Sequence, residues 1–252
     1  SIFCALTISL IVITGKDILK IFFVAGFNSL GPVLPKQPPI ILEQTTKNLF
    51  VSIGKLGPIA LDHHPGFFVK GFIPNSIFIG IDGDFAPWVG TIIKHVETPI
   101  LLVCEMDRLE EVAIRLSRVG FDNVLGHLKG GVSSWGKDDL ATISSISAEK
   151  FNTIYQANNQ IDIVDVRKET EYQTRHIIDA KLAPLSMLEI HGSTFVNDKQ
   201  NYVHCAGGYR SVIACSLLKR AGIHNTINIE GGFAAIKKTT INLSVEDCSS
   251  TL

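Results

Sequence analysis

An internal repeat constrains this chain more than any other feature of its sequence. Two apolar runs, 99–104 and 201–205, each end on a cysteine, and a Gly-Gly pair follows Cys104 and Cys205 at the same separation. A shorter echo relates residues 59–62 to residues 163–165. Repetition on this scale indicates two copies of one structural unit. A chain of 252 residues is long enough for two domains that each bury a core.

Within each copy, short apolar strands alternate with helical patterns. Strands are expected at about 59–61, 100–103, 161–165, 202–204 and 227–229, and helices at about 108–118, 148–156 and 211–220. Such alternation predicts a parallel sheet with helices on its faces and functional groups at the carboxyl ends of the strands. Only 19% of the residues are charged, as suits sheets buried on both faces. The predicted fold class is therefore α/β, with two domains that each hold a small parallel sheet flanked by helices.

The loop after the second cysteine carries the chemistry. Cys205 lies where a strand turns into a helix, and backbone N–H groups at a helix N-terminus bind anions and favour the reactive thiolate. Gly207 and Gly208 are expected to let the backbone curl tightly, and Arg210 adds a permanently charged fork for an oxyanion. Cys205 is thus the predicted nucleophile, and the predicted substrate-binding residues are Ala206, Gly207, Gly208, Tyr209, Arg210 and Ser211. Tyr209 is expected to shape the mouth of a pocket.

The other cysteines and the histidines predict no second site. A buried structural role is the alternative for any free cysteine, and Cys215, inside an apolar helical pattern, is expected in the core. Five cysteines without paired spacing argue against a disulfide framework and for a reducing compartment. No metal and no cofactor are expected, since the pair His63 and His64 has no further ligands to join it. His204 is expected to point into the core rather than to act as a base.

The motif Cys-x-x-Gly-x-Arg-Ser at 205–211 resembles the active-site loop of rhodanese-family sulfurtransferases. Segment 161–167 is similar to the family's strand that ends in Asp-x-Arg, which implies supporting roles for Asp165 and Arg167. Segment 171–180 resembles the family's Glu-Tyr to Gly-His-Ile-Pro-Gly-Ala stretch and departs from it at Arg175, Ile178 and Asp179. Segment 227–233 resembles the closing strand and Gly-Gly turn. Cysteine phosphatases use a loop one residue longer, so a phosphatase or arsenate reductase is a less favoured alternative.

The first copy of the repeat is expected to be catalytically silent. Cys104 is followed by Glu105, Met106 and Asp107 instead of glycines, and carboxylates near a thiol raise its pKa. This copy is interpreted as a packing partner for the second, with a redox or substrate role of Cys104 left open.

A further resemblance concerns the region before and within the first copy. Phe-Ala-x-Trp-x-Gly at 85–90 and the proline-rich stretch 31–39 are similar to bacterial fusions that place a metallo-β-lactamase-fold persulfide dioxygenase or hydrolase ahead of two rhodanese domains. The metal-binding His-x-His-x-Asp-His run is absent from the sequence. This resemblance implies a partner of that fold or a lost upstream domain. The expected division is an apolar remnant and linker at 1–40, a degenerate rhodanese-like domain at 41–140, a catalytic one at 145–242 and a frayed tail at 243–252.

Together these patterns predict a cytoplasmic, bacterial enzyme. It would move sulfane sulfur from thiosulfate or a persulfide to a thiophilic acceptor through a persulfide on Cys205. A non-catalytic binding or sulfur-relay module is the alternative. A net charge of −1 leaves no basic surface for nucleic acid, so the expected partners are a small anionic sulfur donor and a thiol acceptor. The apolar runs within residues 1–30 are too short and too interrupted by charges to span a bilayer, although a membrane anchor stays open.

Overall fold

The computed structural model describes residues 41–42, 59–60, 65–128, 130–158, 160–195 and 198–245. All of them belong to one compact unit, Pro35–Leu252. Several predictions therefore lie outside the described residues: the apolar remnant, the proline-rich linker, the histidine pair at 63–64 and the end of the tail. No helix in the described ranges is long and apolar enough to cross a membrane.

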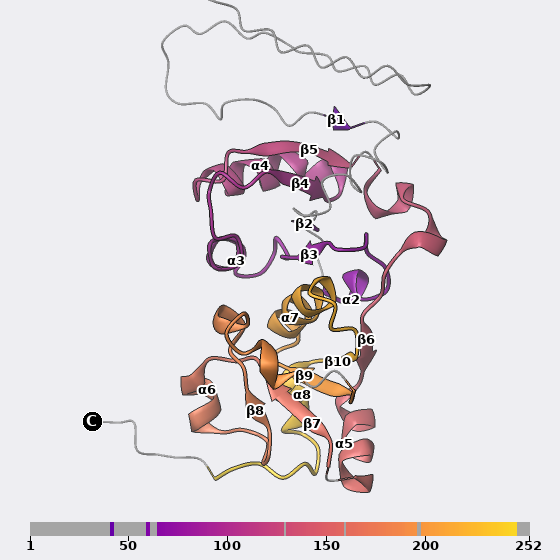
Figure 1. The fold of residues 1–252 in the computed structure, drawn as a ribbon, viewed down its shortest axis with the longest axis vertical. Coiled ribbons are helices and arrows are strands. Elements are labelled where there is room, and N and C mark those ends of the chain that lie inside the picture. The colour runs from indigo at the N-terminus through magenta and orange to yellow at the C-terminus, as the bar shows by residue number, and fades with distance from the viewer. Residues whose placement is uncertain are drawn as a thin grey trace, which may run out of the picture. The chain divides into compact units, whose positions relative to one another are not determined.

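The first copy of the repeat forms a five-stranded parallel sheet in the order β1-β5-β4-β2-β3 (Figure 1). Its strands are β1 (Ile41–Leu42), β2 (Ile59–Ala60), β3 (Ile77–Phe78), β4 (Ile100–Val103) and β5 (Val124–Leu128). Its α-helices are α2 (Pro65–Phe68), α3 (Phe85–Ile92) and α4 (Leu109–Ser117), and its 3₁₀ turns are η2 (Met106–Arg108), η3 (Gly131–Ser134) and η4 (Lys137–Asp139).

The second copy forms another five-stranded parallel sheet, in the order β6-β10-β9-β7-β8. Its strands are β6 (Ser144–Ile146), β7 (Asp162–Asp165), β8 (Lys181–Leu182), β9 (Asn201–His204) and β10 (Thr226–Ile229). Its helices are α5 (Ala148–Ala157), α6 (Glu169–Thr174), α7 (Tyr209–Arg220) and α8 (Gly232–Ile236), with 3₁₀ turns η5 (Leu185–Met187) and η6 (Gly192–Thr194). Each strand occupies the place of the strand five earlier in the chain. The predicted α/β class and the predicted repeat are both confirmed.

Helix α7 joins the two copies. Seven of its residues are buried, and it lies between the sheets in Figure 1. Phe78 of the first copy donates its backbone N–H to the Ser216 hydroxyl at 3.1 Å. One apolar cluster runs from Phe78 and Leu101 in the first copy to Val212 and Cys215 in the second. The expected core position of Cys215 is confirmed, and the two copies share part of their core through α7.

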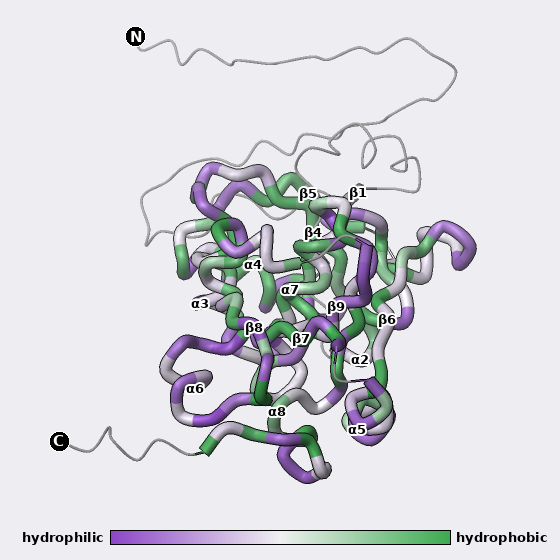
Figure 2. The backbone as a smooth tube through the Cα atoms, turned by 60° about the horizontal axis from the view of Figure 1, so that its bottom comes forward, coloured by the Kyte–Doolittle hydropathy of each residue, from purple (hydrophilic) through white to green (hydrophobic). Residues whose placement is uncertain are grey.

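Polar helices cover other parts of the second sheet. Figure 2 shows hydrophilic residues along α6, none of which is buried, whereas β4 in the first copy is hydrophobic and fully buried. A central strand of a parallel sheet has packed layers on both faces, which explains its continuous apolar run. α6 instead keeps one face in solvent, and that exposure leaves its glutamates available to nearby cations.

Several sequence predictions need adjustment at element ends. β7 begins at Asp162, α4 is preceded by the 3₁₀ turn η2, and α7 begins at Tyr209 rather than at 211. The tail is not frayed at its start, because Ser244 donates its backbone N–H to the His176 carbonyl at 2.8 Å and Leu243 forms an antiparallel bridge with Ile177. Short elements such as β3, β8 and α6 were not predicted, because a segment of two to six residues is too short to show a hydrophobic periodicity.

Candidate active site

Cys205 follows β9 directly and lies at the start of α7. Its Sγ accepts the backbone N–H of Gly208 at 3.1 Å and lies 3.6 Å from the Ser211 hydroxyl, which it contacts as a thiol donor. The residue is 1% exposed. Gly208 caps α7 with φ +97°, so the chain reverses there and the Gly208 N–H points at the sulfur. The predicted strand-to-helix turn thus places a sulfur atom among donors that stabilise negative charge.

Only one of the two loop glycines is required by the backbone. Gly208 has a positive φ, and an added Cβ would lie 3.2 Å from the Gly231 nitrogen. Gly207 has no positive φ, and no atom lies within 4 Å of the place where its Cβ would be. The prediction that both glycines allow the tight curl is wrong for Gly207, because a single left-handed residue is enough to reverse the chain.

The Gly-Gly turn after β10 supports the cysteine loop from behind. Phe233 donates its N–H to the Cys205 carbonyl at 2.6 Å, and Ala234 donates to the Ala206 carbonyl at 2.9 Å. A Cβ on Gly232 would lie 2.4 Å from the Cys205 carbonyl oxygen, a separation that cannot be accommodated. The Gly231-Gly232 pair, one of the repeated features of the sequence, therefore helps to hold the backbone of Cys205 in place.

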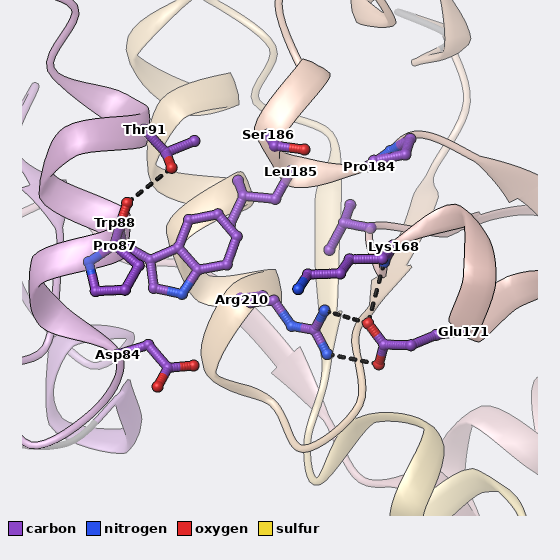
Figure 3. A pocket seen from close by; sticks show the side chains of 11 residues that line it. Asp84, Pro87, Trp88, Thr91, Lys168, Glu171, Pro184, Leu185, Ser186 and Arg210 are labelled. Atoms are coloured by element: carbon purple, nitrogen blue, oxygen red, sulfur yellow. Dashed lines mark hydrogen bonds and ion pairs between the residues drawn. The ribbon is translucent and has the colours of Figure 1, made fainter.

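Arg210 is held by a carboxylate of the chain itself. Its Nη1 and Nη2 donate to the two oxygens of Glu171 at 2.6 and 2.8 Å, and the same carboxylate accepts the Lys168 N–H at 3.1 Å (Figure 3). The hydrogen bond from Arg210 is the main cause that lowers the pKa of Glu171. Sequence reasoning assigned the fork of Arg210 to an oxyanion and overlooked this partner. The one signal was Glu171 itself, which opens the Glu-Tyr segment.

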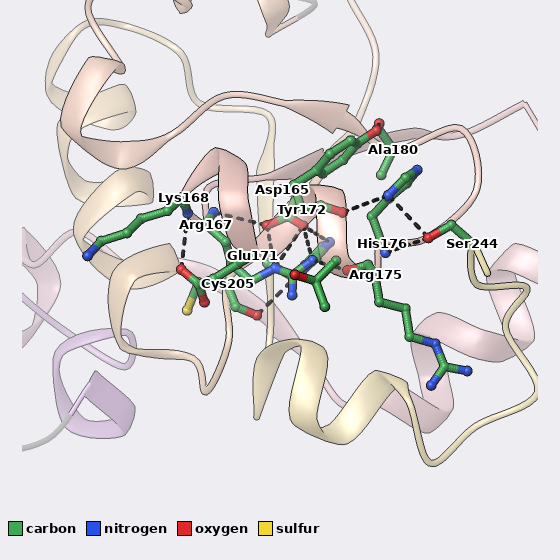
Figure 4. A network of polar contacts seen from close by, with 12 residues as sticks. Asp165, Arg167, Lys168, Glu171, Tyr172, Arg175, His176, Ala180, Cys205 and Ser244 are labelled. Carbon is green, nitrogen blue, oxygen red and sulfur yellow. Dashed lines mark hydrogen bonds and ion pairs between the residues drawn. The ribbon is translucent and has the colours of Figure 1, made fainter. Parts of the chain in front are cut away.

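A buried ion pair lies beside the cysteine loop. Asp165, at the end of β7, accepts hydrogen bonds from Arg167 Nε and Nη2, the shortest of which is 2.6 Å (Figure 4). Arg167 also donates to the Arg175 carbonyl at 2.8 Å, and its guanidinium lies 4.1 Å from the centre of the Phe233 ring. Phe233 in turn holds the Cys205 carbonyl. The structure thus links Asp165 and Arg167 to the loop through backbone and packing contacts.

His204 lies below the loop in a closed environment. It is 0% exposed, and its Nε2 is 3.8 Å from an Asp165 oxygen. Burial lowers the pKa of His204, with the nearby Asp165 carboxylate opposing that effect. The predicted inward orientation is confirmed. A neutral, enclosed imidazole has no route to a substrate proton, so the geometry offers no general base at this position.

The turn between α6 and β8 forms in spite of its unusual sequence. Asp179 adopts φ +67°, and Asn75 adopts the same value at the equivalent place in the first copy. Asp and Asn tolerate the left-handed region better than most residues. Tyr172 ties the turn to α6 by donating its hydroxyl to the Ala180 carbonyl at 2.5 Å. The departures from the family pattern are therefore accommodated within the same local geometry.

Tyr209, which the sequence predicted at the mouth of a pocket, turns toward the first copy and is not among the residues that line the pocket beside the cysteine loop. Its hydroxyl donates to the Gly80 carbonyl of the first copy at 2.8 Å, and its ring meets Phe78 edge to face at 5.6 Å. A Cβ on Gly83 would lie 2.6 Å from the Tyr209 ring. The side chain turns toward the first copy because an apolar surface and a carbonyl acceptor are both within its reach there. It anchors the first residue of α7.

A pocket of about 440 Å³ lies beside the cysteine loop, between α3 of the first copy and the second copy (Figure 3). Cys205 is not among its lining residues; Arg210 is the loop residue that borders it. The lining residues are Asp84, Pro87, Trp88, Thr91, Val166, Lys168, Glu171, Pro184, Leu185, Ser186 and Arg210. The first copy, predicted to be only a packing partner, therefore supplies one wall of this pocket.

Cys104 occupies the place of Cys205 in the first copy, in a different environment. It is 5% exposed, and its pKa is raised to about 11 by burial first and then by Glu105 and Asp107. Burial likewise raises the pKa of Cys215 to about 12. Neither thiol is ionised near neutral pH, so neither is a nucleophile comparable with a cysteine at the start of a helix.

Comparison with known proteins agrees with the two-copy architecture. The model of the rhodanese-like domain matches residues 61–138 and 147–239. The putative sulfur carrier protein YrkF of Bacillus subtilis is 30% identical over 104 residues, or 41% of this chain and 55% of that protein. The chain thus spans about half the length of that relative. A sulfurtransferase of Allochromatium vinosum is 27% identical over 93 residues, or 37% of this chain and 87% of the other. Among solved structures, a rhodanese-like domain protein of Staphylococcus aureus is 28% identical with a TM-score of 0.38, covering 42% of this chain and all of that one.

Proposed function

This chain belongs to the rhodanese-like domain family, and on that premise we propose that it is a sulfurtransferase that carries sulfane sulfur on Cys205. The observation that supports this most is the contrast between the two equivalent cysteines. Cys205 accepts the Gly208 N–H at the start of α7, whereas burial, and then the carboxylates of Glu105 and Asp107, raise the pKa of Cys104. Only the second copy offers a sulfur atom in an environment that stabilises a thiolate.

The proposed reaction is a double displacement. The Cys205 thiolate attacks the outer sulfur of thiosulfate or of a persulfide, R–S–SH. A new S–S bond forms at Sγ, the S–S bond of the donor breaks, and sulfite or the thiolate R–S⁻ leaves with the bonding electrons. An acceptor thiolate then attacks the outer sulfur of the Cys205 persulfide and restores the Cys205 thiolate. Neither half-reaction requires an external oxidant.

The loop residues Ala206 to Ser211 would hold the transferred sulfur. The Gly208 N–H and the Ser211 hydroxyl, which both contact Sγ, would stabilise negative charge on it. Asp165 and Arg167 would be positioning residues, because Arg167 packs on Phe233 and the Phe233 N–H binds the Cys205 carbonyl. Arg210 can contact an anionic donor once one of its two hydrogen bonds to the Glu171 carboxylate is broken.

A second candidate is a non-catalytic module that binds or relays sulfur. It is favoured by the 1% exposure of Cys205 and by the occupation of Arg210 by Glu171, since both hinder access of a free substrate. The similarity to a putative sulfur carrier protein is compatible with this alternative. A phosphatase or arsenate reductase remains less favoured, because the cysteine loop is one residue too short to surround a tetrahedral phosphate.

The surroundings of the enzyme are proposed from sequence alone. A metallo-β-lactamase-fold protein, as partner or as an upstream domain, would supply or consume the persulfide. A cytoplasmic location in a bacterial cell would supply thiols as acceptors. Both proposals would be tested by asking whether the chain copurifies with such a protein from its own cells.

The deciding experiment measures the mass of the Cys205 peptide after incubation with thiosulfate or glutathione persulfide, followed by cyanide. A sulfurtransferase gains one sulfur on Cys205 and releases thiocyanate, and Cys205→Ser abolishes both. The matched control is Cys104→Ser, which removes the equivalent thiol of the first copy and should leave both intact. A protein that is folded but gains no sulfur from either donor would contradict the catalytic proposal and favour the binding module.

A further inference from the structure

The pocket beside the cysteine loop has a wall that the proposed reaction does not use. Asp84, Pro87, Trp88 and Thr91 all come from α3 or its N-cap, in the copy whose cysteine is inactive (Figure 3). Pro87 and Trp88 belong to the Phe-Ala-x-Trp-x-Gly segment at 85–90 that stood out in the sequence, and Asp84 and Thr91 lie close beside it in the chain. Phe85 is 3% exposed and anchors α3 in the first core, which leaves Trp88 as the aromatic surface presented to the pocket.

The charges that line the pocket balance. Arg210 and Glu171 neutralise each other through two hydrogen bonds. The remaining pair, Lys168 and Asp84, has no ion-pair partner among the residues that the structure describes, and Figure 3 shows the two on different sides of the pocket. The pocket therefore offers one unpaired cation and one unpaired anion, with apolar surface between them from Trp88, Pro87 and Leu185.

A small inorganic dianion fits this lining poorly. Thiosulfate would gain Lys168 and would meet Asp84 and Glu171, and it would leave most of a cavity of about 440 Å³ empty. That volume lies in the range of roughly 300–1,000 Å³ that is typical of pockets for organic ligands. A ligand with one positive group, one negative group and an apolar stem would complement the cation, the anion and the apolar surface of the lining.

We propose that this pocket binds the organic part of a persulfide that carries both an ammonium and a carboxylate group, as amino acids and short peptides do. Lys168 pairs with the carboxylate, Asp84 with the ammonium, and the stem packs on Trp88. The first copy then determines donor specificity for the second. This assignment rests on the proposed function, since the sulfur must continue past the Arg210–Glu171 pair to reach Cys205.

The proposed step is balanced in atoms and electrons. The S–S bond of R–S–SH breaks, the outer sulfur with its proton bonds to Cys205 Sγ, and R–S⁻ remains in the pocket with the bonding electrons. Arg210 is the cation of the cysteine loop that borders the pocket.

The test compares four donors on the full chain: glutathione persulfide, cysteamine persulfide without a carboxylate, 3-mercaptopropionate persulfide without an ammonium, and thiosulfate. Sulfur loading on Cys205 is followed by mass, and kcat/KM by thiocyanate release. Glutathione persulfide should exceed thiosulfate by at least about tenfold in kcat/KM, equivalent to one well-formed extra contact.

Two variants separate the contributions. Lys168→Gln should lower kcat/KM roughly threefold to fivefold for the donors with a carboxylate and leave cysteamine persulfide unaffected. Asp84→Asn should do the same for the donors with an ammonium and leave 3-mercaptopropionate persulfide unaffected. Lys150→Gln, at an exposed lysine of α5 outside the pocket, controls for net charge, and far-UV circular dichroism verifies the fold of each variant.

The outcomes are distinguishable. Loading by thiosulfate at a rate equal to or above that of glutathione persulfide, or equal effects of both variants on all donors, would overturn the specificity assignment and leave the sulfurtransferase proposal standing. No loading from any donor in folded protein would overturn both.

Discussion

At the scale of single residues, equivalent positions in the two copies have diverged in chemistry while keeping their backbone. Cys104 and Cys205 both come directly after a central strand, and Gly131 and Gly232 both place a positive-φ glycine near the cysteine carbonyl. The difference lies in the next residues along the chain. Glycines and an arginine come after Cys205, where the Gly208 N–H contacts the sulfur, and carboxylates come after Cys104.

The loop glycines give the first prediction. Gly208→Ala should lower the rate of sulfur loading on Cys205 at least about tenfold, because a left-handed residue with a Cβ costs about 1–2 kcal/mol and the strain would displace the N–H that contacts Sγ. Gly207→Ala is the matched control and should keep most of the rate, since its Cβ would meet nothing. Equal losses in both variants would show that the reactive loop has a different geometry.

We expect two buried histidines to make the free energy of unfolding depend on pH. Burial lowers the pKa of both His204 and His127. Below about 6.5 the unfolded chain binds protons that the folded chain does not, so the free energy of unfolding should fall as pH drops, by up to about 1.4 kcal/mol per pH unit for each histidine. Urea unfolding at pH 7.5 and at pH 5.5 measures this decrease. Glu171, whose pKa is lowered, stays ionised at both values and does not contribute to the difference. A slope that is unchanged in His204→Asn would contradict the assignment to His204.

At the scale of elements, two features hold the start of α7. Phe233 and Ala234, which follow the Gly-Gly turn, donate their N–H groups to the loop carbonyls, and Tyr209 ties the first turn of α7 to the Gly80 carbonyl of the first copy. A helix N-terminus can orient donors toward a ligand only if its own first turn is rigid. The loop is therefore supported from its own sheet and from the neighbouring copy.

A substitution at Gly232, in the Gly-Gly turn of the second copy, should lower sulfur transfer more than the same substitution at Gly131, its equivalent in the first copy. Gly232→Ala places a Cβ 2.4 Å from the Cys205 carbonyl, so the loop must move, and we expect at least about a tenfold loss in loading rate. In Gly131→Ala the nearest contact is the Cys104 carbonyl at 3.5 Å, which is ordinary van der Waals distance, although its positive φ carries the same backbone strain. This variant should lose some stability in urea and little activity. Equal activity in the two variants would contradict the supporting role of the turn.

At the scale of the whole molecule, the described copies share a core. Phe78 is 0% exposed, packs against Phe68 and Tyr209, and belongs to the cluster that includes Val212 and Cys215 of α7. Domains that share buried apolar surface lose it together when one of them opens. The first copy therefore contributes to the stability of the second as well as to its pocket.

Unfolding of the two copies should be cooperative. Both tryptophans, Trp88 and Trp135, lie in the first copy, so their fluorescence reports on that copy while far-UV circular dichroism reports on both. The two urea transitions should coincide. Phe78→Ala should shift them together to lower urea, with a loss of about 3–5 kcal/mol in the free energy of unfolding. Two separate transitions, with only the fluorescence transition shifted by the substitution, would show that the copies are independent.

The sequence by itself determined the α/β class, the repeat, the position of Cys205 at a strand-to-helix turn and the contrast with Cys104. These come from local signals, namely apolar runs, glycine pairs and charges adjacent in the chain. Such signals can be interpreted without knowing how the elements pack. Only the tertiary structure decided that Arg210 pairs with Glu171, that Tyr209 faces the first copy, and that Trp88 and Asp84 border the pocket of the second. Each of these contacts joins residues far apart in the chain, and a side chain's partner depends on which elements the fold places next to it.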